Sequence, residues 1–376
     1  MLCLGIETSC DETSLALVEN NRLLGQKTFS QIDCHAVFGG VVPELACREH
    51  LNKIGPLYRQ LLEDSGINPG QISHVAVTRG PGLLGCLLVG LGFAKGLCMG
   101  LNIPLIGVNH LHAHLMAPGM NTEITYPVLG LLVSGGHTSI YLIKDELSFE
   151  LLGRTLDDAA GEAFDKAAKT LNLPYPGGVY IDRLAKHGDP NCKIFSRPYL
   201  DNTNLDFSFS GIKTAVINHV RNNPDLLNHD ISLSRADEPS VFGRLADVCA
   251  SFNQAVSGTL VVKLKRALDR HQVQGIILAG GVAANSMIRN SIKKLAQDQS
   301  LQLIMPEPWL CTDNAAMVAW YGNILMKHGF VHSLDLEAVP RGRKIPWDYT
   351  RFNRKNRNSL ALFKGTGDRH PVTHLS

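Results

Sequence analysis

The stretch GIETSCDETSLALV, residues 5–18, has the pattern of a β-hairpin with a polar tip. Residues 2–7 and 14–18 are apolar runs, and the segment between them is rich in hydroxyl and acidic side chains. Two apolar runs around a short polar segment are typical of paired strands and their turn. We therefore expect a hairpin whose tip presents Asp11 and Glu12.

The outline of this hairpin returns further along the chain as GLLVSGGHTSIYLI, residues 130–143. The positions that match without a gap are Gly5 and Gly130, Ser9 and Ser134, Thr13 and Thr138, and Ser14 and Ser139. A second pair of segments, residues 75–108 and 276–305, shares the order strand, glycine turn, helix and strand. Two repeats in the same order predict an internal duplication.

Three histidines follow the last strand of the first copy, in LIGVNHLHAH, residues 105–114. The apolar start of this stretch predicts a buried strand, and Asn109 has the side chain of a helix N-cap. On the helix that follows, His110 and His114 share one face and His112 points away. Two imidazoles on one face can form half of a metal site, although a plain polar helix start fits this window equally well.

The last strand of the second copy leads to Asp313 instead of a histidine. If the two copies face each other across a cleft, His110, His114 and Asp313 lie at equivalent strand exits, where open α/β sheets bind ligands. These three side chains are therefore our candidate ligands for one metal ion.

The composition is that of an ordinary globular protein of 376 residues, with 44% apolar and 19% charged residues. This length favours two domains or three. We place a first domain at residues 1–126, a second at 127–330, and a C-terminal helix with a basic tail at 331–376. Residues 48–64 and 157–169 are predicted to be helices, the second with acidic residues in its first turn.

The nine cysteines are scattered and include no Cys-x-x-Cys pair, which indicates a reducing compartment. The N-terminus lacks the basic region of a signal peptide, and Lys95 and Pro104 interrupt the one long apolar stretch, residues 83–108. We read that stretch as a core helix and a strand. We therefore expect a cytoplasmic protein with no membrane partner.

The net charge of +2 is unevenly distributed, because residues 341–376 hold nine Lys/Arg and two Asp/Glu. A basic tail on an acidic body suggests a polyanionic partner such as RNA. A solvated, disordered tail explains the same composition equally well.

Two polar hairpin tips and two glycine turns in duplicated halves are the pattern of the actin-like phosphotransferase architecture. Backbone N–H groups and hydroxyls at the two tips can surround phosphates. The glycine turn at residues 279–281 leaves room for an adenine ring. The sequence therefore predicts an α/β protein with the actin-like ATPase (ASKHA) fold and a cleft between its halves.

Ten short motifs resemble the universal tRNA N6-adenosine threonylcarbamoyltransferases, in particular the bacterial TsaD family. The first five are GIETSCDETS (5–14), VPELACREH (42–50), GPG (80–82), NHLHAH (109–114) and VSGGHT (133–138). The other five are DDAAGEAFDK (157–166), YPGG (175–178), FSFSGIKT (207–214), GGVAAN (280–285) and CTDN (311–314). The resemblance implies the ASKHA fold with two duplicated RNase H-like domains.

The resemblance also implies a reaction, in which an acyltransferase moves a threonylcarbamoyl group from threonylcarbamoyl-AMP to N6 of adenosine 37 in tRNAs that read ANN codons, forming t6A. It assigns one divalent ion per chain to His110, His114 and Asp313, with Fe²⁺ expected and Zn²⁺ as the alternative. It implies ANN-decoding tRNA, a TsaB-like paralogue and a TsaE-like ATPase as partners, with the paralogue bound through the N-terminal half. By motif, the substrate contacts are Val133, Ser134, Gly135, Gly136, His137, Asp165, Gly178, Asp182 and Asn285.

The N6 amine is a poor nucleophile, because its lone pair is delocalised into the adenine ring. Positioning of the reactants and stabilisation of developing charge must therefore supply most of the rate enhancement. Asp11 or Glu12 is our candidate for accepting the N6 proton, although both can serve only to cap a turn or hold a metal-bound water. We expect Arg79 to contact the tRNA backbone. Trp347 and Tyr349 in the tail can stack an exposed base, unless the tail is unstructured.

Three other classes of protein fit parts of the pattern. A metalloprotease would use the paired histidines, but Leu111 stands where a zinc protease has its glutamate. A sugar or acetate kinase of the same fold would use the phosphate-binding tips, but its Mg²⁺ is held by carboxylates. A pure scaffold would have lost the three candidate ligands, all of which are present.

Overall fold

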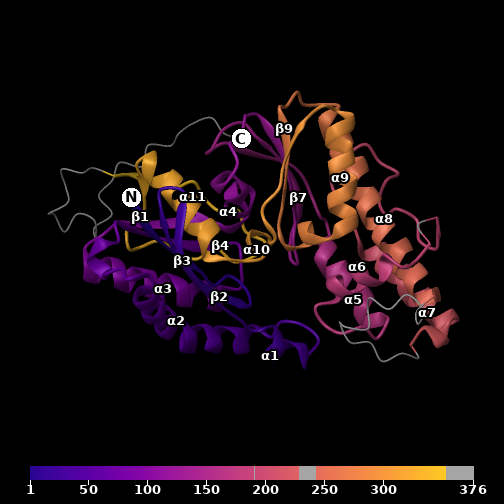
Figure 1. Ribbon diagram of the computed structural model, residues 1–376, viewed down its shortest axis with the longest axis horizontal. Coiled ribbons are helices and arrows are strands. Elements are labelled where there is room, and N and C mark those ends of the chain that lie inside the picture. The colour runs from indigo at the N-terminus through magenta and orange to yellow at the C-terminus, as the bar shows by residue number, and fades with distance from the viewer. Residues whose placement is uncertain (190, 228–242, 353–376) are drawn as a thin grey trace. The chain divides into compact units, whose positions relative to one another are not determined.

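The computed structural model describes residues 1–189, 191–227 and 243–352. They form two compact units, which Figure 1 shows as ribbons. The first unit joins Met1–Glu123 to the chain from Thr312 onward, and the second unit is Ile124–Cys311. The second unit thus ends well before residue 330, the boundary that the sequence suggested, because the helix after Thr312 packs on the sheet of the first unit.

The first unit is built on a 5-stranded sheet in the order β3-β2-β1-β4-β5. Its strands are β1 (Leu2–Glu7), β2 (Glu12–Glu19), β3 (Arg22–Ser30), β4 (His74–Gly80) and β5 (Leu105–Asn109). β1 and β2 form the predicted antiparallel hairpin, with Gly5 opposite Ala16, whereas β4 is parallel to both β1 and β5. The carboxyl ends of these three parallel strands therefore share one edge, where ligand sites form in such sheets.

Helices cover both faces of the first sheet. They are α1 (Ile32–Ala36), α2 (Pro43–Ser65), α3 (Leu84–Leu101), α4 (His110–Met116) and α11 (Ala315–Lys327), with 3-10 turns at Pro69–Gln71 and Ala117–Met120. Along β1, Leu4 and Ile6 join the apolar cluster beneath α2 and α3, while Gly5 points to α11. A β-carbon at Gly5 would lie 2.2 Å from the Ala315 carbonyl oxygen, so only glycine permits this close approach.

The second unit repeats the strand order of the first. Its 5-stranded sheet has the order β10-β9-β6-β7-β8, with β6 and β7 as the antiparallel hairpin and β9 parallel to β6. Its strands are β6 (Val128–Val133), β7 (Thr138–Ile143), β8 (Phe149–Arg154), β9 (Gly275–Ala279) and β10 (Gln302–Ile304). The match of two sheets, strand by strand, confirms the predicted duplication.

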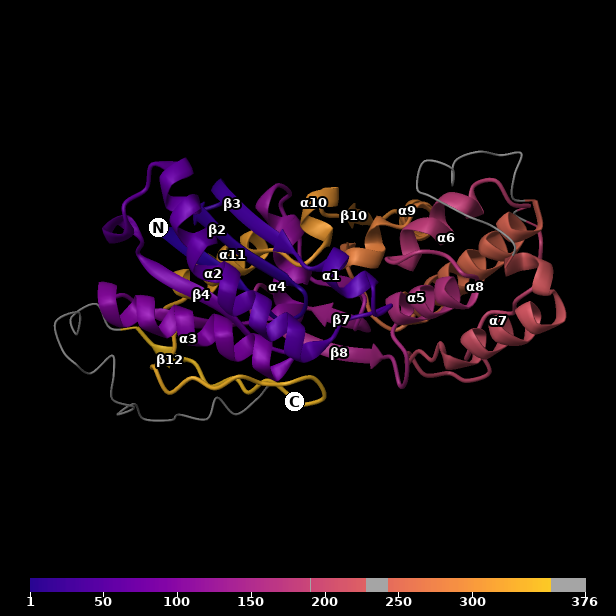
Figure 2. The same cartoon turned by 90° about the horizontal axis from the view of Figure 1, so that it is seen from below.

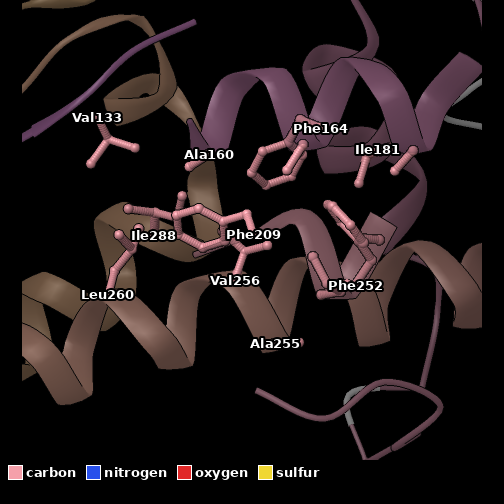
Figure 3. Packing of buried hydrophobic residues seen from close by; sticks show 14 of the residues in the cluster. Val133, Ala160, Phe164, Ile181, Phe209, Phe252, Ala255, Val256, Leu260 and Ile288 are labelled. Atoms are coloured by element: carbon pink, nitrogen blue, oxygen red, sulfur yellow. The ribbon is translucent and has the colours of Figure 1, made fainter. Parts of the chain in front are cut away.

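Helices pack on the second sheet around one apolar core, shown in Figure 3. They are α5 (Ala160–Thr170), α6 (Gly177–Ala185), α7 (Ser210–Asn222), α8 (Gly243–Leu268), α9 (Ser286–Asp298) and α10 (Pro308–Cys311), with 3-10 turns at Pro224–Leu227 and Gly281–Ala284. Phe164 of α5 meets Phe252 of α8 edge to face, with ring centroids 5.2 Å apart. Removing either buried ring costs about 3–5 kcal/mol of unfolding free energy.

The helix predicted at residues 157–169 begins later than expected, at Ala160. Asp157 is not in its first turn but accepts hydrogen bonds from the Phe209 amide and the Ser210 hydroxyl at the start of α7. The acidic pair that resembled a helix start therefore ties two segments of the second unit together. The side chain of an aspartate near a helix start can therefore bond backbone groups that do not belong to that helix.

The chain after α11 returns along the first unit as a C-terminal segment, residues 330–352. It contains a short antiparallel pair, β11 (Phe330–Val331) with β12 (Thr350–Arg351), and no helix among its residues. The Val339 amide donates to the Arg79 carbonyl at 2.7 Å, and the Tyr349 hydroxyl donates to the Gly107 carbonyl at 2.8 Å. The C-terminal helix predicted within residues 331–376 is therefore absent from residues 331–352, which pack on the first unit instead. The rest of the basic tail, and with it the choice between an RNA contact and an unstructured tail, lies outside the described residues.

Two helices are long and apolar enough to cross a membrane by length and composition alone, among the residues described. Of the apolar window in α8, 72% is buried inside the protein, and of that in α3, 33%. The buried core helices of many proteins are equally long and apolar, so these two helices are weak evidence for a membrane span. Figures 1 and 2 show α3 alongside α2. On α3, the side chains of Leu84, Leu88 and Met99 are exposed, whereas Leu87 and Leu91 are buried.

Candidate metal centre and the two hairpin tips

The helix α4 places two histidines side by side. Its N-cap is Asn109, whose side-chain oxygen accepts a hydrogen bond from the Leu111 amide at 3.0 Å, as the sequence predicted. One turn apart, His110 and His114 are both buried, with ring centroids 4.6 Å apart. His112 turns away and meets the ring of Tyr321 instead.

The third candidate ligand, Asp313, reaches the histidines from the start of α11. Asn314 is the N-cap of that helix and accepts from the Met317 amide at 2.9 Å. This cap fixes the backbone at the helix start, next to Asp313. One oxygen of Asp313, Oδ1, lies 2.9 Å from His114 Nε2 and 3.5 Å from His110 Nε2. One ligand atom from each residue lies within 4.8 Å of the others. All three belong to the first unit, so the predicted cluster forms there.

The donor set fits a divalent transition metal. Two imidazole nitrogens and one carboxylate oxygen suit iron or zinc and leave positions for substrate. Burial lowers the pKa of His110, but the carboxylates of Asp313 and Glu7 outweigh burial and raise that pKa to about 9. Burial lowers the pKa of His114, which favours the neutral ligating form. A bound ion would take the place of the protons that lie between the histidine nitrogens and the carboxylate of Asp313.

The tip of the first hairpin, residues 8–11, is held by side chains. On α2, His50 makes two contacts with the hairpin. Its Nδ1 lies 2.8 Å from the Thr13 hydroxyl, and its Nε2 lies 2.9 Å from the Cys10 carbonyl oxygen. Since a carbonyl only accepts, Nε2 carries the proton and Nδ1 accepts from Thr13. Asp11 is buried beside this contact. Burial and the neighbouring carboxylates, Asp11 first, raise the pKa of Glu12 well above its usual range.

Glu7 is a residue of this site that sequence reasoning missed. It ends β1, is fully buried, and its Oε2 lies 3.0 Å from His110 Nδ1. Its other contacts are the Ser9 amide at 2.6 Å and the Thr78 hydroxyl at 2.6 Å. The available signal was an acid inside an otherwise apolar strand, which is costly to bury unless it is paired.

The tip of the second hairpin, residues 134–137, is held mainly by the backbone. The Ser134 amide donates to the His137 carbonyl at 2.8 Å, and the Ser134 hydroxyl accepts from the His137 amide at 3.1 Å. The first turn of α5 donates two backbone N–H groups to this tip, from Gly161 to Ser134 and from Glu162 to Gly135. Gly135 is exposed, with open space where a β-carbon would lie.

The other predicted substrate contacts lie on α5, α6 and the start of α9. Asp165 accepts from the Gly177 amide at 2.9 Å. Asp182, one turn after Gly178 on α6, accepts from the amide and hydroxyl of Ser286. Asn285 caps α9 by accepting from the Ile288 amide at 3.0 Å. These side chains are all fixed within the second unit by hydrogen bonds of the protein itself.

Comparisons with known proteins show which family this chain resembles. The family model for TsaD, tRNA N6-adenosine threonylcarbamoyltransferase, matches residues 22–320. The enzyme of that name from Nitratidesulfovibrio vulgaris is 58% identical over 93% of this chain and 98% of its own. The one from Maridesulfovibrio salexigens is 54% identical over 93% of this chain and 99% of its own.

The chain belongs to the tRNA N6-adenosine threonylcarbamoyltransferase family. It is therefore an acyltransferase of tRNA modification, which sets aside the protease, kinase and scaffold alternatives. The family is metal-dependent, in keeping with the cluster of His110, His114 and Asp313.

A likeness to solved structures supports the predicted ASKHA fold. The HypF protein of T. kodakarensis superimposes with a TM-score of 0.53 at 13% identity, over 87% of this chain and 48% of its own. At that identity the likeness bears on the fold alone. Together with the family match, it confirms the actin-like α/β architecture that the duplicated hairpins indicated.

The role predicted for Arg79 is wrong for this member of the family. Its guanidinium is buried and forms a two-pronged ion pair with Asp348 of the C-terminal segment, at 2.5 and 3.3 Å. His332 lies 3.3 Å from the same guanidinium. A buried, paired arginine is unavailable to a phosphate backbone. Asp348 lies 269 residues after Arg79, and no local sequence pattern links such distant residues.

Proposed function

We propose that the protein transfers the threonylcarbamoyl group from threonylcarbamoyl-AMP to N6 of adenosine 37 in tRNAs that read ANN codons. Family membership and the convergence of His110, His114 and Asp313 support this proposal. When bound there, a divalent ion would offset negative charge on the oxygens of the adenylate. We propose Fe²⁺ as that ion and Zn²⁺ as the alternative, because the donor set suits both.

The second unit is proposed to bind the adenylate through Val133, Ser134, Gly135, Gly136, His137, Asp165, Gly178, Asp182 and Asn285. The exposed glycine of the tip allows phosphate oxygens to approach backbone closely. A β-carbon at Gly177 would lie 2.2 Å from the Ala168 side chain, whereas one at Gly178 would meet only ordinary contacts near 3.7 Å. Packing therefore explains the first glycine but not the second, which supports a ligand role for Gly178.

We propose that the first tip accepts the N6 proton. A protonated carboxyl cannot act as a base, and the pKa of Glu12 is raised by burial and by Asp11. Asp11 is therefore the stronger candidate for the acceptor, with Glu12 as its neighbour.

The tRNA is proposed to contact exposed basic residues of the C-terminal segment, at 341–344. The Arg341 amide donates to the Gly82 carbonyl at 3.1 Å, and a β-carbon at Gly82 would lie 2.7 Å from the Ser9 carbonyl oxygen. Arg341, in the middle of the segment, thus lies beside the first tip. Phosphate contacts by Arg343 and Lys344 would add affinity that falls steeply with salt.

A salt titration of tRNA binding tests this contact. In the double variant R343A/K344A, we expect weaker binding and a salt slope smaller by about two ion contacts. Lys144→Ala, which changes an exposed, ion-paired lysine of the second unit, is the matched control. An unchanged slope in R343A/K344A would place the tRNA elsewhere.

The TsaB-like paralogue is proposed to dock on α2 and α3. A groove of about 710 Å³ lies between these helices, lined by Cys47, Leu51, Ile54, Gly85, Leu88, Val89, Gly92, Phe93, Gly96 and Leu97. Leu51 and Leu88 are 68% and 55% exposed, and the β-carbon positions of Gly92 and Gly96 are open. An apolar groove with small residues on its rim suits the close approach of another helix. A TsaE-like ATPase is proposed as the third component.

Sedimentation of the mixed proteins tests the docking face. Leu88→Arg should abolish the heterodimer, because it places a charge in the apolar groove. Leu151→Arg, at a leucine of the second unit that is 46% exposed, should leave it intact. A heterodimer that survives Leu88→Arg would overturn this face.

The decisive test of the reaction is nucleoside mass spectrometry. Full-length protein, its partners, threonylcarbamoyl-AMP and an unmodified ANN-reading tRNA are expected to give threonylcarbamoyladenosine. His110→Ala should lower the rate by about 100-fold or more, since metal assistance is worth several kcal/mol. His112→Ala, on the same helix but outside the cluster, should retain most activity. Equal losses in both variants would contradict the assignment of the ligands.

A further inference from the structure

We propose that Glu7 is the positioning residue that orients His110 for metal binding. This inference rests on the proposed metal site and adds a residue to it. It starts from three contacts of one buried carboxylate, to the Ser9 amide, the Thr78 hydroxyl and His110 Nδ1.

As an ionised carboxylate, Glu7 accepts in all three contacts. The Ser9 hydroxyl, 3.4 Å from the same His110 Nδ1, can also accept from it. The Ser9 amide can only donate, and the Thr78 hydroxyl donates at 2.6 Å to the same oxygen, Oε2, that lies 3.0 Å from His110 Nδ1. An ionised carboxylate has acceptor capacity for all three and no proton to place. The geometry thus assigns the proton of this contact to His110 Nδ1.

The consequence concerns the other nitrogen of His110. With Nδ1–H donated to Glu7, Nε2 of His110 keeps a free lone pair for an ion and lies 3.5 Å from Asp313 Oδ1. A carboxylate behind a metal-binding histidine fixes the tautomer and the ring plane and increases its basicity. Glu7 is held in turn by β1 and β4, so the orientation of His110 is built into the sheet.

The second copy of the fold shows that this acid is not required by the hairpin itself. Counting from the matched serines, Leu132 stands at the position of Glu7 and is equally buried. A strand of this architecture therefore accepts an apolar residue there. The acid occurs in the copy that carries the histidines.

The test is metal affinity, measured apart from activity. Metal-free full-length protein is titrated with Co²⁺, and the visible absorption of the bound ion gives the Kd and reports the ligand set. We expect Glu7→Gln to raise the Kd by about 10- to 100-fold and to change the spectrum. The amide cannot accept three hydrogen bonds without turning its NH₂ group toward a donor. Glu19→Gln, an exposed acid at the far end of β2, should bind like the wild type.

A second variant keeps the test decisive if Glu7→Gln fails to fold, as judged by circular dichroism. Glu7→Asp keeps the charge but withdraws it by about 1.5 Å, one carbon–carbon bond, and should also raise the Kd. Thr78→Val removes one donor and leaves the His110 contact, so a smaller rise is expected. A Kd within twofold of the wild type in the folded Glu7 variants would overturn the proposal.

The outcomes also separate this inference from the metal site on which it rests. If the wild type and His110→Ala bind Co²⁺ equally, the proposed site itself fails, and the role of Glu7 fails with it. If His110→Ala loses the ion while both Glu7 variants keep it, only the positioning role is wrong.

Discussion

The two hairpin tips share one backbone plan but are held in different ways. The first tip is held by hydrogen bonds to two buried side chains, those of Glu7 and His50. The second tip is held by main-chain hydrogen bonds from α5, and its turn contains an exposed glycine, Gly135. Side-chain anchoring concentrates charge, which suits an ion, whereas exposed backbone N–H groups at a glycine turn suit a phosphate. The two copies of the fold are thus the basis for the two chemically distinct sites proposed above.

The strongest way to break this contrast is to remove the acid that completes the cluster of the first unit. Asp313→Ala should abolish Co²⁺ binding and lower product formation by about 100-fold or more, because a metal site with only two protein ligands is weak. Binding of AMP, measured by calorimetry, should stay near the wild-type value, since its proposed contacts lie in the second unit. Loss of both binding events together would mean that the tips are not separate sites.

A charge placed on the second tip should sharpen the contrast. Gly135→Asp puts a carboxylate where phosphate is proposed to bind, and like-charge repulsion of about 1–2 kcal/mol should weaken AMP binding by roughly tenfold. Gly135→Asn has the same shape without the charge and is the matched control. Co²⁺ affinity should be unchanged in both. Equal AMP affinities for the two variants would argue against a phosphate at this tip.

The anchoring histidine of the first tip should give the protein a characteristic pH dependence. Burial lowers the pKa of His50 below its usual 6.5, so the folded protein favours the neutral ring. Its contribution to stability is present above pH 6.5 and is lost as the pH falls through the lowered value. We expect the Tm difference between wild type and His50→Gln to shrink on acidification below pH 6.5. A difference that grows instead would mean that the protonated ring is the one bound.

The smallest effect is expected at the paired glycines of α6. Gly178→Ala should leave the Tm unchanged or slightly raised, since alanine favours a helix, but should raise the KM for the adenylate several-fold. Gly177→Ala should lower the Tm, because its β-carbon would collide with Ala168. Thermal melts and initial rates on the two variants measure both effects. A normal KM in Gly178→Ala would remove this glycine from the proposed site.

Local patterns were sufficient to predict much of the fold and the side chains of the candidate metal cluster. The hairpins, the Asn109 cap and the i, i+4 histidines all depend on residues near one another in sequence. The duplication drew attention to Asp313, but the structure places it at the start of α11 in the first unit, with the histidines, and not on the second copy. The family resemblance added the reaction and the residues of the second unit.

Contacts between distant segments escaped prediction. Arg79 and Asp348 are paired across most of the chain, and no local pattern marks either residue for the other. Asp157 resembled a helix start because its partners at residues 208–210 were unknown. Glu7 was hidden by its apolar neighbours, since a strand pattern says which residues are buried but not which hydrogen bonds they make. The predicted domain boundary at residue 330 differs from the observed one for the same reason, because α11 packs on a sheet whose strands lie at residues 2–109.

This late return of the chain has a consequence for synthesis. The first sheet is complete once residue 109 has been made, yet the face at Gly5 stays uncovered until α11 emerges, after the whole second unit. Domains generally fold as units during translation, beginning at the N-terminus. Here the N-terminal unit must wait for α11, and Asp313 arrives with the helix that closes it. The candidate metal cluster is therefore complete only after the whole second unit has been synthesised.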